Sequence, residues 1–141
     1  MRIGFFNSYT LWGGGEKWHF TAAEYMAENG HDCFILSDPE GELYQRAHNS
    51  PLLTPAPIKV NKHSYWNPLA QIRYKKTFKN LKLDALVFNA PQDVRSAAYV
   101  ARKTEIPKVV YRNGMPVPIP EKKGFFRAFK KGLTDIVCIS Q

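Results

Sequence analysis

The chain has 141 residues, about the size of one domain, and its 44% hydrophobic content is too apolar for a disordered protein. No apolar run approaches the roughly 20 residues that span a bilayer, so an integral membrane protein is excluded. The net charge of +8 is uneven: residues 1–58 carry three bases and seven acids, and residues 59–141 carry seventeen bases and five acids. Such an excess predicts an anionic partner, which could be nucleic acid, a phosphate-bearing ligand or an anionic membrane surface.

Short apolar runs alternate with helical patterns along the chain. Strands are predicted at 3–6, 33–36, 57–60, 85–88, 109–111 and 136–139, and 57–60 is the weakest candidate. Most of these runs are continuously apolar, which is typical of strands buried on both faces of a parallel sheet. Helices are predicted between them at 16–29, 41–48, 67–81, 92–103 and 121–131, with Gly30 just past the end of the first. The order predicts one doubly wound α/β domain of Rossmann type, with a mainly parallel six-stranded sheet and ligands at the carboxyl ends of the strands.

The apolar start of the chain is too short for a signal peptide, which favours a cytoplasmic protein. Cys33 and Cys138 lie inside apolar runs without a CxxC spacing. We expect both to be small buried hydrophobic residues in a reducing compartment.

After the first predicted strand, a loop ends in three glycines that lead into the first predicted helix. These are Gly13, Gly14 and Gly15, and Glu16 comes next. Glycines at a helix N-terminus let backbone N–H groups approach a phosphate or a sugar hydroxyl, although they could equally permit only a flexible turn. A dinucleotide fingerprint would need glycine where Trp18 stands, and no Gly-Lys-Ser/Thr follows for a P-loop. Asp38 lies where a ribose-binding acid would fall, but the residues after it indicate an ordinary turn. We therefore expect no bound cofactor.

The loop ending in Gly-Gly-x-Glu, the Asn29-Gly30-His31-Asp32 entry to the second strand and the final Asp135 to Ser140 stretch occur in a characteristic order. Together they resemble the amino-terminal domain of family 4 glycosyltransferases, which have the two-domain GT-B architecture, over essentially the whole chain. The resemblance implies retaining transfer of a sugar from a nucleotide-sugar donor to a glycan or lipid-linked acceptor in cell-surface polysaccharide synthesis. It also implies that residues 1–141 form the acceptor-side domain. The donor-binding C-terminal domain, with its pair of glutamates, is then missing, and the chain alone is expected to be inactive.

Two more loops fall at strand carboxyl ends. Asn89 stands where many relatives carry a histidine near the donor phosphates, and Arg112, Asn113 and Gly114 resemble an arginine-glycine turn in members that build lipopolysaccharide-type glycans. Arg112 is suited to bidentate binding of a phosphate or carboxylate. The plainer interpretations are that Asn89 ends a strand and that Arg112 forms a surface ion pair.

No catalytic residue can be assigned from the sequence. The histidines His19, His31, His48 and His63 share no metal-binding motif, so we expect no metal site. Glu16 could act as a base, but an acid in the first turn of a helix also has a structural reason to be there.

Two predicted helices are strongly basic, through Lys75, Lys76 and Lys79 in one and Lys123, Arg127 and Lys130 in the other. These side chains could form a solvated face, or they could hold the protein at the inner, anionic surface of the membrane. An alternative function is a basic, non-enzymatic Rossmann-like domain that binds nucleic acid or a nucleotide. The predicted placement of aromatic residues on the opposite helix faces disfavours base stacking and hence nucleic acid.

Overall fold

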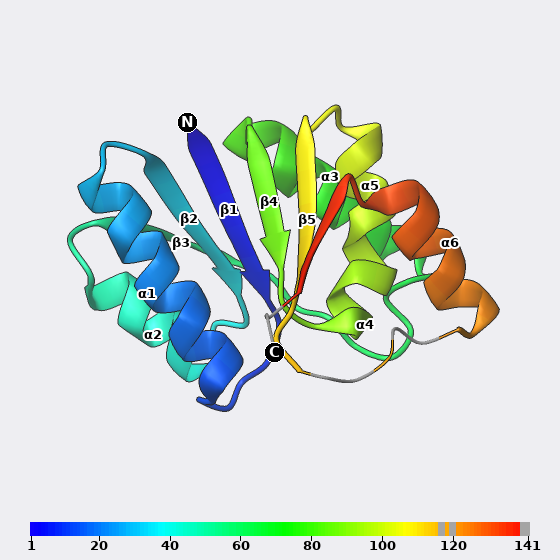
Figure 1. Ribbon diagram of the computed structural model, residues 1–141, viewed down its shortest axis with the longest axis horizontal. Coiled ribbons are helices and arrows are strands. Elements are labelled where there is room, and N and C mark those ends of the chain that lie inside the picture. The colour runs from blue at the N-terminus through cyan, green and yellow to red at the C-terminus, as the bar shows by residue number, and fades with distance from the viewer. Residues whose placement is uncertain (116–117, 119–120, 139–141) are drawn as a thin grey trace.

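Six parallel strands form the centre of the computed structural model, in the order β3-β2-β1-β4-β5-β6 (Figure 1). The structure describes residues 1–115, 118 and 121–138. The strands are β1 (Arg2–Asn7), β2 (Asp32–Ser37), β3 (Leu53–Pro57), β4 (Ala85–Phe88), β5 (Lys108–Asn113) and β6 (Asp135–Cys138). The α/β, Rossmann-like prediction is thus confirmed.

Helices cover both faces of the sheet (Figure 1). On one face lie α1 (Gly14–Glu28) and α2 (Glu42–Asn49). The other face carries α3 (Pro68–Leu81), α4 (Pro91–Asp93), the π-helical turn η1 (Val94–Ala98), α5 (Tyr99–Lys103) and α6 (Lys123–Gly132). Within the described residues, no helix is both long enough and apolar enough to cross a membrane.

Alternation along β1 divides the hydrophobic core into two clusters. Phe5 points to the α1 and α2 side, whereas Phe6 points to the other side, where its ring centroid lies 5.0 Å from that of Phe88. On the second side α3 contributes Tyr74 and Phe78. Because helices cover both faces, a ligand can reach the strands themselves at their carboxyl ends, and the loops predicted to be functional lie there.

Two strands differ from the sequence prediction. The third strand ends at Pro57, so the predicted run 57–60 overlaps only its last residue, and the strand is instead formed by Leu53–Pro57. The sixth strand lies at the sheet edge and is exposed along Asp135–Cys138, with Val137 54% exposed, so burial on both faces was wrong for it. Cys33 is buried as expected, but Cys138 is exposed for the same reason. The serine that closes the resemblance, Ser140, lies outside the described residues.

The predicted helix over 92–103 is divided into three parts, with the π-helical turn η1 in the middle. In η1, four residues are buried because the turn packs between the sheet and α6: Val94, Ser96, Ala97 and Ala98. Gly132 of α6 makes this packing close: a Cβ there would lie 2.9 Å from the backbone of Ala98. Nearly continuous burial leaves no 3.6-residue period, so the sequence could not reveal the wider winding.

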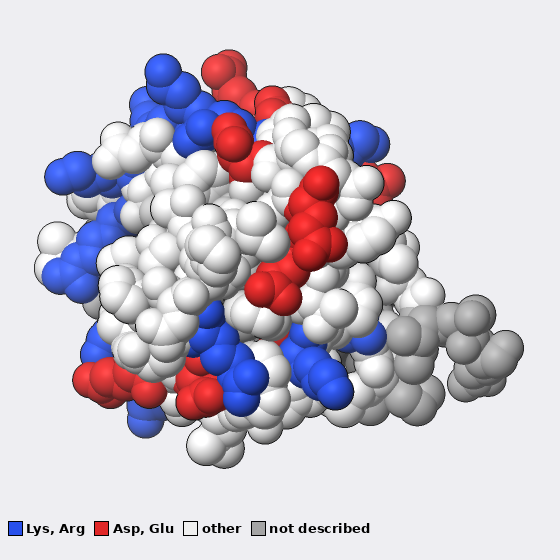
Figure 2. Space-filling view, turned by 90° about the vertical axis from the view of Figure 1, so that its left-hand side faces the viewer, with Lys and Arg blue, Asp and Glu red and all other residues white. Residues whose placement is uncertain are grey.

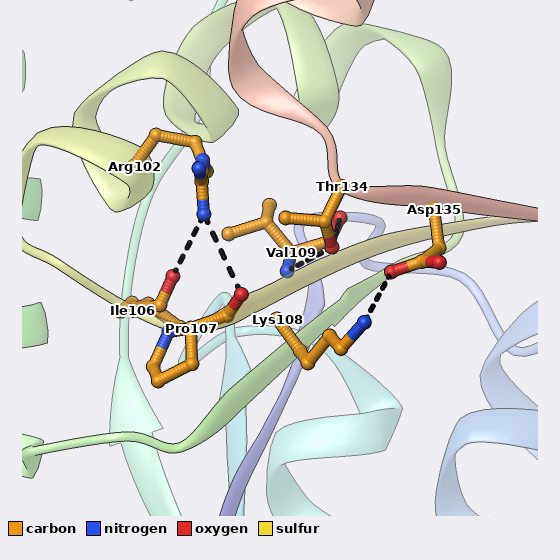
Figure 3. A network of polar contacts seen from close by, with 7 residues as sticks. All are labelled: Arg102, Ile106, Pro107, Lys108, Val109, Thr134 and Asp135. Atoms are coloured by element: carbon orange, nitrogen blue, oxygen red, sulfur yellow. Dashed lines mark hydrogen bonds and ion pairs between the residues drawn. The ribbon is translucent and has the colours of Figure 1, made fainter.

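Side-chain contacts tie the exposed β6 to the sheet (Figure 3). Thr134 Oγ1 accepts a hydrogen bond from the Val109 backbone N–H at 3.0 Å, and Lys108 Nζ lies 3.3 Å from Asp135 Oδ2. Arg102 Nη1 donates to the carbonyls of Ile106 and Pro107 at the start of β5. The Thr134 and Lys108 contacts join β5 to its edge neighbour, and the Arg102 bonds hold the segment that leads into β5.

Candidate functional site

A cavity of about 440 Å³ lies at the carboxyl ends of β1, β4 and β5. Its walls come from the end of β5, from the first residues of α1 and α4, and from the loops beside them: Tyr9, Gly14, Gly15, Glu16, Asn89, Ala90, Pro91, Tyr111, Arg112, Asn113, Gly114, Met115 and Pro118. The sequence-predicted residues Gly14, Gly15, Glu16, Asn89, Arg112 and Asn113 are therefore brought together, and Gly13 lies beside them at the N-cap of α1.

Glu16 holds the glycine loop in place. Its Oε2 accepts a hydrogen bond from the Gly13 backbone N–H at 2.9 Å, and its Oε1 accepts one from Asn7 Nδ2 at 2.8 Å. This is the carboxylate half of a capping box, and the side chain is 5% exposed. The geometry favours the structural interpretation of Glu16, because both carboxylate oxygens are already used in joining β1 to the start of α1.

Gly15 allows a side chain from β4 to lie against the helix. A Cβ built on Gly15 would overlap Asn89 Nδ2, whereas one on Gly14 would meet nothing within 4 Å. The two neighbouring glycines are thus different: Gly15 is required by the close approach of Asn89, and Gly14 faces open space.

Arg112 completes this group. Its Nη1 donates to Asn89 Oδ1 at 2.9 Å, and its Cζ lies 4.5 Å from the ring centroid of Trp18. None of the ion pairs found within the described residues involves Arg112, so the surface ion pair envisaged for it is not formed. Asn89 and Trp18 hold the guanidinium at the cavity wall, and its other N–H groups can meet an anion.

His19 lies one turn into α1 and is fully buried. Its ring makes an edge contact with Phe5, with centroids 5.5 Å apart, and neither ring nitrogen has a hydrogen-bond partner. Burial, with a smaller contribution from the positive charge of Arg112, lowers the pKa of His19 to about 3. The side chain is therefore neutral and part of the core. The described part of the chain brings no three His, Cys, Asp or Glu side chains into a metal-binding group.

Asp93 is a buried acid that the sequence reasoning missed. It follows β4, and its carboxylate accepts hydrogen bonds from both the backbone N–H and the hydroxyl of Ser8, the residue after β1. Burial raises the pKa of Asp93 to about 7, and the nearby Glu16 acts in the same direction, while the Ser8 bonds oppose the shift. Only the fold reveals this clasp, because 85 residues separate its two members.

The pKa of Asp93 predicts a pH-dependent stability. Between about pH 4 and about pH 7 the folded chain keeps a proton that the unfolded chain has lost, so the free energy of unfolding falls as pH rises through this window. Asp93→Asn removes that titration. As pH rises through this window, the free energy of unfolding of the variant should increase relative to that of the wild type, by at most about 1.4 kcal/mol per pH unit. Urea unfolding at several pH values measures the difference. Glu28→Gln, at an exposed position, is the control, and an equal slope in the two variants would contradict the prediction.

The basic residues lie outside this cavity, on the helices of the other face. Lys75, Lys76 and Lys79 are exposed on α3, and Lys123, Arg127 and Lys130 are exposed on α6. α5 lies between the two helices, so they form two patches in one layer. Phe126 is 60% exposed on α6 and has the Lys130 ammonium 5.5 Å from its ring centroid, so the expected separation of aromatic and basic sides is wrong for this residue.

The comparisons with known proteins agree with this architecture. The family model described as Glycosyltransferase Family 4 matches residues 12–141. Comparison with curated proteins gives no match. Among solved structures, a glycosyltransferase from Rickettsia africae ESF-5 is similar over 98% of this chain, with 20% identity and a TM-score of 0.72. The UDP-GlcNAc 2-epimerase from Methanocaldococcus jannaschii is similar over 99% of it, with 12% identity and a TM-score of 0.62.

At such low identities the structural similarities show the fold, and this chain spans only 36% and 40% of those two proteins. The family match is more specific, since it includes the glycine loop, the β4 and β5 connections and the helices between them. Because that match extends over residues 12–141, the chain belongs to Glycosyltransferase Family 4.

Proposed function

We propose that this domain forms the acceptor side of a retaining glycosyltransferase, which moves a sugar from a nucleotide-sugar donor to a glycan or lipid-linked acceptor. The observation that carries the proposal is the convergence of Gly15, Asn89 and Arg112 on one cavity at the carboxyl edge of the sheet. The family supplies the reaction class and the retaining outcome, and cell-surface polysaccharide synthesis is the role it favours.

The roles of the residues follow from their chemistry. The first-turn N–H groups of α1 at Gly14 and Gly15 would meet a phosphate or hydroxyl oxygen, with the helix dipole favouring negative charge. Arg112 would bind the same anion from the end of β5, since its guanidinium is fixed by Asn89 and Trp18. Asn89 can orient a group by hydrogen bonding but cannot transfer a proton at neutral pH.

Catalysis in this proposal needs a second Rossmann-like domain that holds most of the donor. A cavity of about 440 Å³ on one domain can orient the acceptor end of the reaction, but transfer requires the reacting atoms to be held in line by both halves. The proposed reaction uses no cofactor. The proposed place of action is the cytoplasm, with the protein peripheral to the inner face of the membrane.

Donor binding tests this division of labour. Titration calorimetry of the 141-residue chain with UDP-, GDP- and ADP-sugars should give dissociation constants weaker than micromolar, and the chain alone should transfer no sugar. A micromolar or tighter constant would place the donor site on this domain instead. In the protein that joins this domain to a donor-binding domain, nucleotide release should depend on an acceptor, and the anomeric signal of the product by NMR should show retention. Inversion or no transfer would contradict the proposal.

A further inference from the structure

A second cavity, of about 400 Å³, lies between α3, η1, α5 and α6 and has no residue in common with the first. Its walls combine aromatic rings with cations: Tyr65, Trp66, Gln71, Arg95, Ser96, Tyr99, Gly124, Arg127 and Ala128. No acidic residue lines it, as far as the described residues extend. A polar cavity of one charge sign predicts a ligand of the opposite sign.

Arg95 is the centre of this second cavity. It comes from the π-helical turn η1, a form of helix that is frequent at functional sites. Its Cζ lies 3.5 Å from the ring centroid of Tyr65 and 4.9 Å from that of Phe125. Its Nε is buried and has no hydrogen-bond partner. None of the ion pairs among the described residues involves Arg95, so an anionic ligand that meets its terminal N–H groups in the cavity would supply the missing partner.

Contacts within the protein hold the walls around Arg95 in place before any ligand binds. Gln71 Nε2 donates to the carbonyls of Ser64 and Ser96, at 2.7 and 2.9 Å, and so joins the loop before α3 to η1. Gly124 has no side chain, and a Cβ there would lie 3.2 Å from Arg95 Nε, so the glycine allows α6 to pack closely against the guanidinium. Arg127 brings a second cation, with its Cζ 5.3 Å from the Tyr99 ring centroid. A preorganised site loses less entropy on binding.

The aromatic part selects a ring-shaped ligand. Trp66 is 59% exposed and Tyr65 is 39% exposed at the mouth of the second cavity. The C–H face of a pyranose packs well on such a flat apolar ring, and the two arginines suit a carboxylate or phosphate. We propose that this cavity binds an anionic saccharide, a sugar ring that carries a carboxylate or a phosphate.

The position of the site favours part of an acceptor as the ligand. Asn89 and Arg112, at the carboxyl ends of β4 and β5, line the first cavity, and Arg95 and Gly124, in the helical elements that follow these strands, line the second. An oligosaccharide held by the second cavity would then extend along the segment after β4 toward the first. The identification of the ligand as an acceptor rests on the proposed function, but the binding of an anionic sugar does not.

NMR titration of the 141-residue chain tests the proposal directly. The probes are glucuronate, glucose 6-phosphate and glucose, and the signals followed are the side-chain N–H groups of Arg95 and Trp66. Both anionic sugars should shift these signals to saturation, and glucose should not. Arg95→Gln should weaken binding about tenfold or more, the factor expected for a lost charge-assisted hydrogen bond. Trp66→Ala should also weaken it, and this exposed position serves as the readout if Arg95→Gln does not fold.

Arg46→Gln is the matched control, because Arg46 also stacks on an aromatic ring, 4.2 Å from the Trp12 centroid, but is paired with Glu42. It should leave binding unchanged. Equal shifts with glucose would overturn the anionic specificity, and shifts at Gly15 and Arg112 without shifts at Arg95 would move the ligand to the first cavity. Binding that needs an anionic lipid vesicle would assign the site to a membrane instead. The titration contains no nucleotide-sugar donor and measures no sugar transfer. Failure of this binding and failure of the proposed transferase activity can therefore be told apart.

Discussion

Replacing Gly15 with alanine should lower kcat/KM of the proposed two-domain glycosyltransferase about 10²-fold, whereas Gly14→Ala should change it only a few-fold. The reason is the different space around the two positions. A Cβ on Gly15 overlaps Asn89 Nδ2, so the Asn89 side chain must move and its bond to Arg112 breaks, while a Cβ on Gly14 meets nothing within 4 Å. A displacement of about 1 Å at a substrate-positioning group can cost this much rate.

Stability should change little in either glycine variant. The atom displaced by Gly15→Ala is the end of a half-buried side chain, not part of the backbone, and both variants gain similarly from the higher helix propensity of alanine. Melting temperatures should stay within a few degrees of the wild type. The double variant Gly15→Ala/Asn89→Ala should be no less active than Asn89→Ala alone, because the clash is gone. Equal activity losses at Gly14 and Gly15 would contradict the role given to the Asn89 contact, and matching losses of activity and stability would show that the glycines serve the turn alone.

Much of the fold could be predicted because two physical signals are local. Continuous apolar runs marked β1, β2, β4 and β5, and the helix-ending glycine at Gly30 separated α1 from β2. Where tertiary context decides, the prediction failed. The edge position exposes β6 although its composition is that of a buried strand, and β3 is formed by Leu53–Pro57, a stretch with two prolines that sheet pairing tolerates.

The candidate site shows the same division. Strand ends and the glycine loop identified Gly15, Asn89 and Arg112, because parallel strands bring their carboxyl ends to one edge. The side-chain contacts around these residues could not be predicted from the sequence. The stacking of Arg112 on Trp18 and the hydrogen bond between Ser8 and Asp93 depend on side-chain directions that packing determines. Arg95 was likewise hidden, since its surroundings come from three separate elements and a π-helical turn.

The basic patch on α3 should hold the full protein at an anionic membrane surface. Figure 2 shows that Lys and Arg side chains predominate along the left-hand edge of one face of the molecule. On α3 itself, Lys75, Lys76 and Lys79 are exposed, and Ile72 is 62% exposed beside them. An exposed apolar side chain among lysines is typical of peripheral docking, and each basic residue near the surface contributes about 1 kcal/mol.

Changing Lys75, Lys76 and Lys79 to glutamate reverses the local field and leaves the buried Tyr74 and Phe78 in place, so the fold should survive. Co-sedimentation with vesicles that contain anionic lipid should fall sharply for this variant. Wild-type binding should be strong in dilute buffer and largely lost in concentrated salt, because the Debye length shrinks from about 10 Å at 0.1 M to about 3 Å at 1 M.

Charge reversals on the opposite face of the sheet test whether the position of the charges, and not only their sum, decides binding. Lys17→Glu/Arg46→Glu reverses charges on α1 and α2, which cover the opposite face of the sheet, and should leave vesicle binding nearly intact. Ile72→Ser should weaken binding without changing its salt dependence, since it removes only the apolar contact. If the α3 variant and the wild type sediment equally, or if neither sediments, the lysines of α3 form a solvated face. Part of the positive charge of residues 59–141 would then serve to bind anionic ligands in the two cavities, which Arg95, Arg112 and Arg127 line.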